Sequence, residues 1–258
     1  MFQRSCPAMG EGRLCYNGRM VLPTRVEREL DPYLPDTVAP VIGGVPMRAG
    51  IALAVGAGVF VGLAAIASRP EPNRGDLAIT RLFQRRMPRA AGRILHAVSA
   101  PGYAPFTHAI VVTLAAQCWA LGYRREAIFS VGTMGAGFST GIVKLLIKRP
   151  RPDLSFRLQM RLLKDNSFPS GHATHFPAFY GYVYFLARRY LPHGPLRTLV
   201  LAYCATLIVL VGPSRVYLGH HWASDVAAGY LIGSVYLLAI LQVYMLFDPL
   251  PALDDLDD

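Results

Sequence analysis

Three short polar clusters interrupt an otherwise apolar sequence, and each contains residue types that bind or transfer an anionic group. The clusters are KLLIKRPRPD (144–153), FPSGHATHF (168–176) and SRVYLGHHWASD (214–225). Arginine and lysine bind oxyanions, and histidine transfers protons or attacks as a nucleophile near neutral pH. Ionisable groups at the ends of long apolar segments are costly unless the protein uses them. The clusters are therefore candidates for one site.

The first cluster places basic residues at the end of an apolar helix. Pro150 and Pro152 end that helix near Lys148, so Arg149 and Arg151 emerge where a loop starts. Taken alone, such a cluster is typical of a stop-transfer sequence with snorkelling side chains. Its functional interpretation depends on the other two clusters.

The second cluster predicts a turn that leads into a helix. Ser170 is placed to cap this helix, and the backbone N–H groups near Gly171 form a site for an anion. His172 then lies in the first turn beside that anion. In isolation, a capping serine next to an incidental histidine explains the stretch equally well, and we expect His175 to serve packing or the interface.

The third cluster contains a histidine and a carboxylate four residues apart. On a helix, His221 and Asp225 share one face, so the carboxylate can accept the N–H of one ring nitrogen. That bond fixes the tautomer and leaves the other nitrogen as a nucleophile. His220 points roughly 100° away around the helix, so we favour His221. Pairs of this kind also occur by chance on helix surfaces.

Together the clusters predict a site for a phosphoryl group. Lys144, Arg151, Arg215 and a helix start neutralise the charge on its equatorial oxygens, which is most of what phosphoryl transfer requires. One histidine can attack phosphorus while the other protonates the leaving group.

The elements that position these clusters are predicted to be membrane helices. Of the 258 residues, 53% are hydrophobic and only 16% are charged, which is too apolar for an ordinary soluble domain. A helix needs about 20 mostly apolar residues to span a bilayer. We therefore expect an all-α, six-helix integral membrane bundle with spans at 49–67, 105–121, 127–147, 173–187, 199–211 and 223–247.

A further amphipathic helix is predicted at about 76–100. Its apolar residues recur at helical spacing, while arginines at 81, 85, 89 and 93 fall on another face, as in a helix lying in the membrane interface. We expect Pro88 to kink or divide it. The alternative is a helix on a soluble core with a solvated arginine face.

The remaining chain is predicted to be two tails around one domain. Residues 1–48 read as a polar tail, 49–247 as the six-span domain and 248–258 as an acidic tail, and we expect no cleavable signal peptide. The net charge of +10 is assigned to lipid headgroups or anionic substrates rather than nucleic acid, because no basic recognition helix is apparent. The cysteines lack metal-ligand spacing and no carboxylate cluster is present, so we expect neither a metal nor a cofactor.

Read in order, the clusters resemble a known three-part signature. Lys144 with Arg151-Pro152, then Pro169-Ser170-Gly171-His172, then Ser214-Arg215 with His221 and Asp225 are similar in order and spacing to the type 2 phosphatidic acid phosphatase superfamily, which also includes vanadium haloperoxidases. The signature covers residues 144–225.

This resemblance implies a role for each residue. His221 would be the nucleophile that forms a phosphohistidine, oriented by Asp225. His172 would be the general acid and then the base that activates water. The phosphoryl oxygens would be bound by Lys144, Arg151, Ser170, Gly171 and Arg215, and no metal would be needed.

The function expected from the resemblance is that of an integral membrane lipid phosphatase. We rank undecaprenyl diphosphate first as substrate, then phosphatidylglycerol phosphate or phosphatidic acid. By the same resemblance, the chain is placed in a bacterial inner membrane with both termini in the cytoplasm and the site facing outward.

Two other functions fit the same residues. A vanadate-dependent haloperoxidase-like enzyme shares the signature, but those enzymes are soluble and this chain has long apolar spans. A non-catalytic lipid-phosphate binding or transport protein is the other alternative, and the presence of both histidines and Asp225 argues against it.

Overall fold

A computed structural model of the chain describes residues 14–16, 19–21, 47–69, 71–156, 158 and 165–247. Its α-helices are α2 (Met47–Ala67), α3 (Arg74–Arg86), α4 (Arg89–Ser99), α5 (Ala104–Ala120), α6 (Arg124–Gly132), α7 (Gly135–Leu146), α8 (Gly171–Tyr190), α9 (Pro195–Tyr217) and α10 (Ala223–Leu246). The described residues also include two short 3₁₀ turns, η3 (Ala100–Gly102) and η4 (Leu154–Phe156). The predicted all-α class is confirmed by this helical domain.

A small hairpin lies within the predicted N-terminal tail. Strand β1 (Leu14–Tyr16) pairs antiparallel with β2 (Arg19–Val21), and Cys15 lies opposite Met20. The hairpin belongs to a unit formed by residues 1–52 and 249–258, separate from the unit 53–248 that carries the helices. Residues 47 and 48 of the predicted tail already belong to α2, and the rest of that tail and the acidic tail, 248–258, lie outside the described residues.

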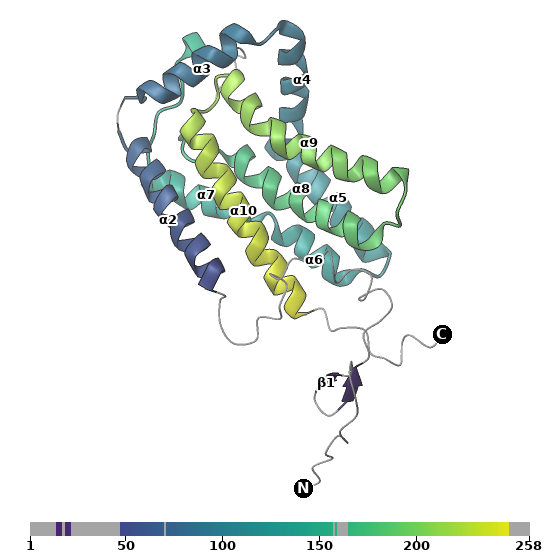
Figure 1. The fold of residues 1–258 in the computed structure, drawn as a ribbon. Coiled ribbons are helices and arrows are strands. Elements are labelled where there is room, and N and C mark those ends of the chain that lie inside the picture. Colours follow the sequence, from purple (N-terminus) through teal and green to yellow (C-terminus); the bar gives the residue numbers. More distant parts are fainter. Residues whose placement is uncertain are drawn as a thin grey trace. The chain divides into compact units, whose positions relative to one another are not determined.

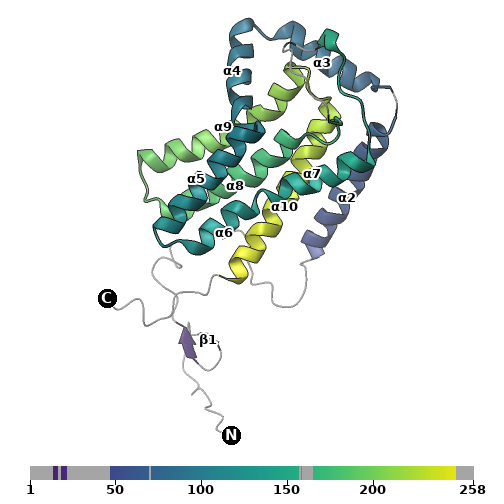
Figure 2. The same cartoon turned by 180° about the vertical axis from the view of Figure 1, so that it is seen from behind.

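Helix α8 is the centre of the helical unit. It packs against α9, α10 and α7, and Figures 1 and 2 show it enclosed by its neighbours. Its buried Phe176, Phe179 and Tyr180 form a core with Val111 of α5 and Val211 of α9. Because α8 is surrounded by protein, it tolerates polar residues that a lipid-facing helix would not.

The predicted third span, 127–147, is not one continuous helix. It is divided into α6 and α7 at Thr133–Met134, where Thr133 Oγ1 donates a hydrogen bond to the Ser130 carbonyl at 2.6 Å. Tyr236 OH donates to the Gly132 carbonyl at 2.9 Å. Glycines at 132, 135 and 137 lower helix propensity here, which the hydropathy pattern did not reveal. With α6 and α7 counted as one interrupted segment, six helical segments lie where the sequence predicted them.

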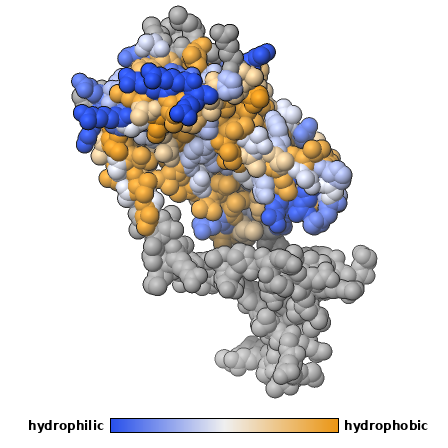
Figure 3. Space-filling model, turned by 45° about the horizontal axis from the view of Figure 1, so that its top comes forward, coloured by the Kyte–Doolittle hydropathy of each residue, from blue (hydrophilic) through white to orange (hydrophobic). Residues whose placement is uncertain are grey.

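The helix lengths and exposed surface are those of a membrane protein. In the part of the chain that the structure describes, three segments are long and apolar enough to cross a bilayer, Arg124–Leu146, Pro195–Tyr217 and Ala223–Leu246, and Val55–Ala67 and Ala104–Ala120 are shorter apolar helices. Large apolar side chains point outward, among them Phe138 (77% exposed) and Leu246 (79% exposed). Figure 3 shows hydrophobic surface over much of the visible face. Such a surface is suited to lipid rather than water.

The predicted interfacial helix forms two helices, α3 and α4, that meet at Met87–Pro88. Pro88 cannot donate the backbone hydrogen bond that would continue α3. The side chains of Arg81, Arg85 and Arg93 are exposed. Helix α3 lies across one end of the bundle (Figure 1), and its first turn places Asp76 in the protein interior, 3% exposed.

Candidate active site

All three polar clusters meet at one pocket of about 380 Å³. It lies at the end of the bundle where α7 and α9 end and α8 and α10 begin. Of the predicted site residues, its wall contains Lys144, Arg151, Gly171, His172, Arg215 and His221. Ser170 and Asp225 are fully buried and are not part of the wall.

The His221 ring is held from both sides, but not as the sequence predicted. Its Nδ1 donates to the Ser167 carbonyl oxygen at 2.9 Å, and its Nε2 lies 3.1 Å from Arg151 Nη1. Asp225 Oδ2 is 3.7 Å from Nδ1, beyond hydrogen-bond distance. The predicted His221–Asp225 hydrogen bond was wrong because His221 precedes α10, which begins at Ala223, so the two residues do not share a helix face.

Asp225 is instead the centre of a buried hydrogen-bond network. Its Oδ2 accepts from Ser167 Oγ at 2.5 Å and from the Trp222 backbone N–H at 2.9 Å, and its Oδ1 is paired with Arg149 Nη1. Ser167 thus contacts the carboxylate through its hydroxyl and His221 through its carbonyl. Asp225 is therefore connected to the imidazole through Ser167, and its Oδ2 lies 3.7 Å from Nδ1.

Arg149 links this network to α3. Its guanidinium, 2% exposed, also pairs with Asp76 Oδ2 at 2.7 Å and donates to Ser224 Oγ at 2.8 Å. The Ser224 backbone N–H and hydroxyl both donate to Asp76, at 2.9 and 2.7 Å. A charge buried this deeply requires partners, and two carboxylates supply them. The sequence placed Arg149 at the start of a loop, yet its side chain is buried, whereas the adjacent Lys148 is exposed.

Lys144 and Arg151 approach each other through a shared carboxylate. Asp165 Oδ2 accepts from Lys144 Nζ at 2.6 Å and Asp165 Oδ1 accepts from Arg151 Nη2 at 2.7 Å. Partial burial works to raise the pKa of Asp165, but Lys144 and Arg151 outweigh it and lower that pKa to about 2. The carboxylate is therefore ionised at neutral pH.

His172 is positioned by aromatic and backbone contacts. Its ring packs edge-on against Tyr103 at 5.0 Å between centroids and stacks with Phe176 at 6.3 Å. Gly102 also faces it, since a Cβ there would lie 2.2 Å from His172 Cδ2. His172 Nε2 and Ser170 Oγ are buried and make no hydrogen bond to any described residue. Both atoms belong to the predicted phosphate site.

Ser170 occupies the N-cap position of α8, but its side chain does not cap the helix. The predicted capping bond was wrong, and the hydroxyl keeps its hydrogen-bonding capacity. The Ser170 backbone N–H donates to the Asp225 carbonyl oxygen at 3.0 Å, which ties the start of α8 to the start of α10. Arg215, in the last turn of α9, is 1% exposed and is held by Ser99 Oγ.

These features agree with comparisons to known proteins. Residues 125–248 match the family model of the PAP2 superfamily. This segment, which contains all three polar clusters, forms a PAP2 superfamily domain. It is 34% identical over 95 residues to phosphatidylglycerophosphatase B of Bacillus subtilis, a match that covers 36% of this chain and 44% of the relative.

A solved structure shares the PAP2 fold. It is that of a transmembrane PAP2 type phosphatidylglycerolphosphate phosphatase from Bacillus subtilis, with a TM-score of 0.64 at 21% identity, covering 75% of this chain and 98% of the other. The fold similarity covers 75% of this chain, well beyond the 95 residues that align to the curated relative. In that alignment, the chain spans less than half of the relative's length.

The electrostatics of the PAP2 site keep His221 neutral. Burial is the main cause that lowers its pKa well below the usual value, and the charges of Arg151, Arg215 and Lys144 lower it further. A neutral imidazole with Nδ1 donating to Ser167 has its lone pair on Nε2. This is the nitrogen that lies inside the pocket beside Arg151.

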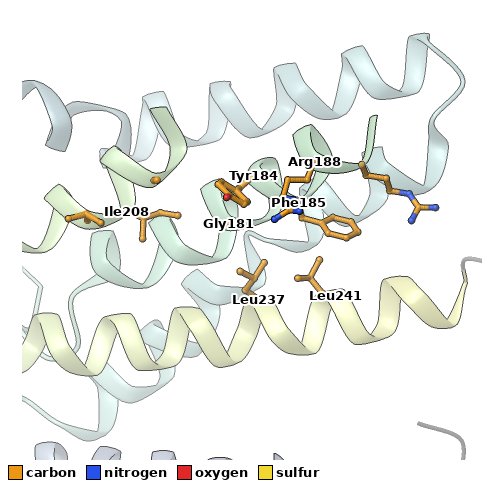
Figure 4. Close-up of a pocket in the computed structure, with 10 residues that line it drawn as sticks. Gly181, Tyr184, Phe185, Arg188, Ile208, Leu237 and Leu241 are labelled. Carbon is orange, nitrogen blue, oxygen red and sulfur yellow. The ribbon is translucent and has the colours of Figure 1, made fainter. Parts of the chain in front are cut away.

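Other candidates in the PAP2 domain are less suited to this chemistry. His220 is buried and does not line the pocket, and His175 stacks on Phe179 at 5.4 Å between centroids. A larger pocket, about 790 Å³, lies among α8, α9 and α10. Figure 4 shows apolar side chains such as Leu237 and Leu241 facing it. It is away from the clusters, and its charged wall residues are Arg188 and Arg189.

Four residues of the site were not predicted from the sequence as participants. They are Asp76, Arg149, Asp165 and Ser167. The sequence did offer a reason to consider Asp76, because it is the single acidic residue between Glu71 and Glu126. Arg149 is set apart from the adjacent Lys148 by its burial and its ion pairs, which the sequence does not show. Among the described residues, no group of three or more His, Cys, Asp or Glu side chains could hold a metal ion.

Proposed function

We propose that this protein is an integral membrane lipid phosphatase that hydrolyses a phosphomonoester or diphosphate through a phosphohistidine intermediate. The observation that carries the proposal is the environment of His221. One ring nitrogen is held by a backbone carbonyl, and the other faces a pocket with Lys144, Arg151, Arg215 and a second histidine. This arrangement suits attack on a phosphorus atom whose oxygens are bound by cations.

In the first step, His221 Nε2 attacks phosphorus and the bond to the leaving oxygen breaks. His172 donates its proton to that oxygen, so the lipid leaves as an alcohol, or as a lipid monophosphate when the substrate is a diphosphate. In the second step, water attacks the phosphohistidine, His172 takes a proton from the water, and the P–N bond breaks to release inorganic phosphate. The two histidines thus divide nucleophilic and acid–base work.

The lipid tail has a path out of the pocket. A neighbouring apolar pocket of about 470 Å³ shares Gly137 and Gly141 of α7 with the catalytic pocket and extends past Phe138 and Leu145. A Cβ at either glycine would meet nothing within 4 Å, so the glycines leave open space between the two pockets. We place the tail here, with its headgroup at His221.

The names of the relatives suggest the order in which substrates are tested. Both similar proteins are named for phosphatidylglycerol phosphate, so we propose this lipid first, ahead of undecaprenyl diphosphate, which the sequence alone ranked first. The purified full chain is tested with both lipids and with phosphatidic acid, and we expect phosphate release from at least one. His221→Ala should abolish it, and absence of release from all three lipids would contradict the proposal.

The tail path has a test of its own. Gly137→Leu should raise KM for a long-chain lipid phosphate and leave KM for a short-chain, water-soluble phosphate ester unchanged. Gly62→Leu on α2, where a Cβ also meets nothing within 4 Å, is the matched control. An equal rise of KM for both substrates would contradict the placement of the lipid tail in this apolar pocket.

The orientation is also a proposal. We place both termini in the cytoplasm and the catalytic pocket on the outer face. A cysteine introduced at Asn166, beside the pocket, should react with an impermeant thiol reagent in intact cells. Protection of that cysteine from the reagent would show that the pocket faces the cytoplasm and would contradict the proposed orientation.

A further inference from the structure

The Asp165 carboxylate lies between two cations at the pocket wall. Lys144 Nζ donates to one of its oxygens at 2.6 Å, and Arg151 Nη2 donates to the other at 2.7 Å. The Asp165 backbone carbonyl accepts a further hydrogen bond from Arg151 Nε at 2.9 Å. One residue therefore holds both cations.

The same contacts reach the catalytic imidazole. Arg151, fixed by Asp165, donates through Nη1 to the His220 carbonyl at 2.7 Å and lies 3.1 Å from His221 Nε2. Nε2 carries the lone pair that the proposed function assigns to attack. A guanidinium N–H directed at that lone pair makes it a poorer nucleophile. Asp165 thus holds Arg151 where it covers Nε2.

A phosphoryl group requires the same donors. Carboxylate and phosphate oxygens both accept charge-assisted hydrogen bonds from arginine and lysine, and two anions at one pair of cations repel each other. The Asp165 carboxylate stays ionised near neutral pH, so protonation does not release the cations. Its side chain is 57% exposed, so turning it toward water disturbs little packing.

We propose that Asp165 is an internal competitor for the phosphate site, which a substrate phosphoryl group must displace from Lys144 and Arg151. The inference rests on the proposed function and adds a residue that sets the affinity of the site. Displacement turns Arg151 toward the phosphoryl oxygens and uncovers His221 Nε2. When the carboxylate recaptures the cations, it weakens the hold of the site on inorganic phosphate.

The test replaces the charge and keeps the shape. Asp165→Asn should lower KM for the lipid phosphate and lower the Ki of inorganic phosphate and of orthovanadate, each by about tenfold, with a smaller change in kcat. If Asp165 served only to position Lys144 and Arg151 for substrate binding, the same variant would raise KM and both Ki values. The sign of the change therefore separates the two roles.

Two matched variants accompany it. Asp153→Asn removes an equal charge from an exposed residue of the same loop that does not line the pocket, and it should leave KM and Ki unchanged. Asp165→Glu retains the carboxylate and should stay near the wild-type values. Equal effects of Asp153→Asn and Asp165→Asn would reduce the proposal to a general effect of net charge and overturn it.

A binding measurement keeps the inference separate from the proposed function. Calorimetric titration of the detergent-purified full chain with orthovanadate requires no turnover. If the wild type hydrolyses no lipid phosphate, the proposed function fails, yet tighter orthovanadate binding by Asp165→Asn would still support the competitor. Unchanged or weaker binding by this variant would overturn it whatever the activity.

Discussion

The two ends of α10 each contact a buried carboxylate, and the two carboxylates differ in what surrounds them. Asp225 lies in the first turn of α10, whereas Glu126 of α6 meets the last turn through Tyr244. Both side chains are almost fully buried, at 0% and 4% exposed. Burial alone therefore does not distinguish a carboxylate beside the pocket from one remote from it.

Glu126 is the centre of a hydrogen-bonded contact between helix ends that serves the fold. Its Oε1 accepts from Tyr190 OH at 2.6 Å, from Tyr244 OH at 2.7 Å and from Arg125 Nη2 at 3.1 Å. The two tyrosine hydroxyls also lie 3.0 Å apart. These contacts join the start of α6 to the ends of α8 and α10, and none of these residues lines the three pockets described above.

The surroundings of Asp225 lead instead to polar atoms that lack partners. Its network passes through Ser167 to His221 in the pocket wall, and His172 Nε2 and Ser170 Oγ are buried nearby without a hydrogen bond among the described residues. Buried polar atoms without partners are rare and call for an explanation, and the phosphoryl group of the proposed substrate would supply it. A buried cluster whose hydrogen bonds are all made stabilises the fold. A buried cluster in which polar atoms lack hydrogen bonds indicates a ligand.

The largest contrast should appear in stability. Arg149→Met leaves Asp76 and Asp225 buried without a positive charge, which should cost about 3–5 kcal/mol of unfolding free energy. Arg125→Met removes a side chain that is 26% exposed and leaves Glu126 its two tyrosines, so about 1 kcal/mol or less is expected. Denaturation of both variants in the same detergent measures the difference. Equal losses would show that the two clusters are energetically alike.

The next contrast is in turnover. Asp225→Asn should lower kcat by about 10- to 100-fold, the range seen when a carboxylate that orients a metal-ligating histidine is lost. In a serine protease triad the equivalent change costs about 10⁴-fold because the wrong tautomer forms. Here the Ser167 carbonyl fixes the tautomer, so a smaller loss is expected. Glu126→Gln should leave kcat unchanged.

The outcome also decides which group sets the tautomer. A loss of about 10⁴-fold for Asp225→Asn would assign that role to Asp225 and contradict the geometry at Ser167. A fall of kcat in Glu126→Gln, with its fold intact, would remove the functional contrast between the two ends of α10.

The smallest contrast is in pH dependence. Because the pKa of His221 is lowered well below its usual value of about 6.5, the acid limb of kcat/KM should lie well below pH 6.5. The unfolded chain takes up a proton at His221 near pH 6.5 and the folded chain does not, so stability from this group is present above about pH 6.5 and is lost as pH falls. His221→Gln should remove that part of the acid sensitivity.

The control for this measurement is Glu126→Gln, which should keep the wild-type kcat/KM profile because it lies at the other end of the bundle. An acid limb at or above pH 6.5 in the wild type would show that His221 is not the neutral nucleophile we describe.

Much of this architecture was readable from the sequence. Apolar length predicted the helical segments, and the spacing of Lys144, Arg151, His172, Arg215 and His221 predicted residues that the fold does bring to one pocket. These predictions succeed because hydrophobic length and the positions of proline, glycine and charge act locally along the chain. The break between α6 and α7 was missed because hydropathy does not register a loss of helix propensity at glycines.

The sequence by itself determined that this chain forms apolar membrane helices, that it carries the PAP2 signature, and which residue types line the pocket. Only the tertiary structure decided the partners of those residues. The Ser167 carbonyl rather than Asp225 holds His221, Asp76 and Asp225 share Arg149, and Asp165 binds Lys144 and Arg151. Hydrogen bonds between residues 14 to 76 positions apart depend on how helix ends meet in space, and no local pattern encodes that.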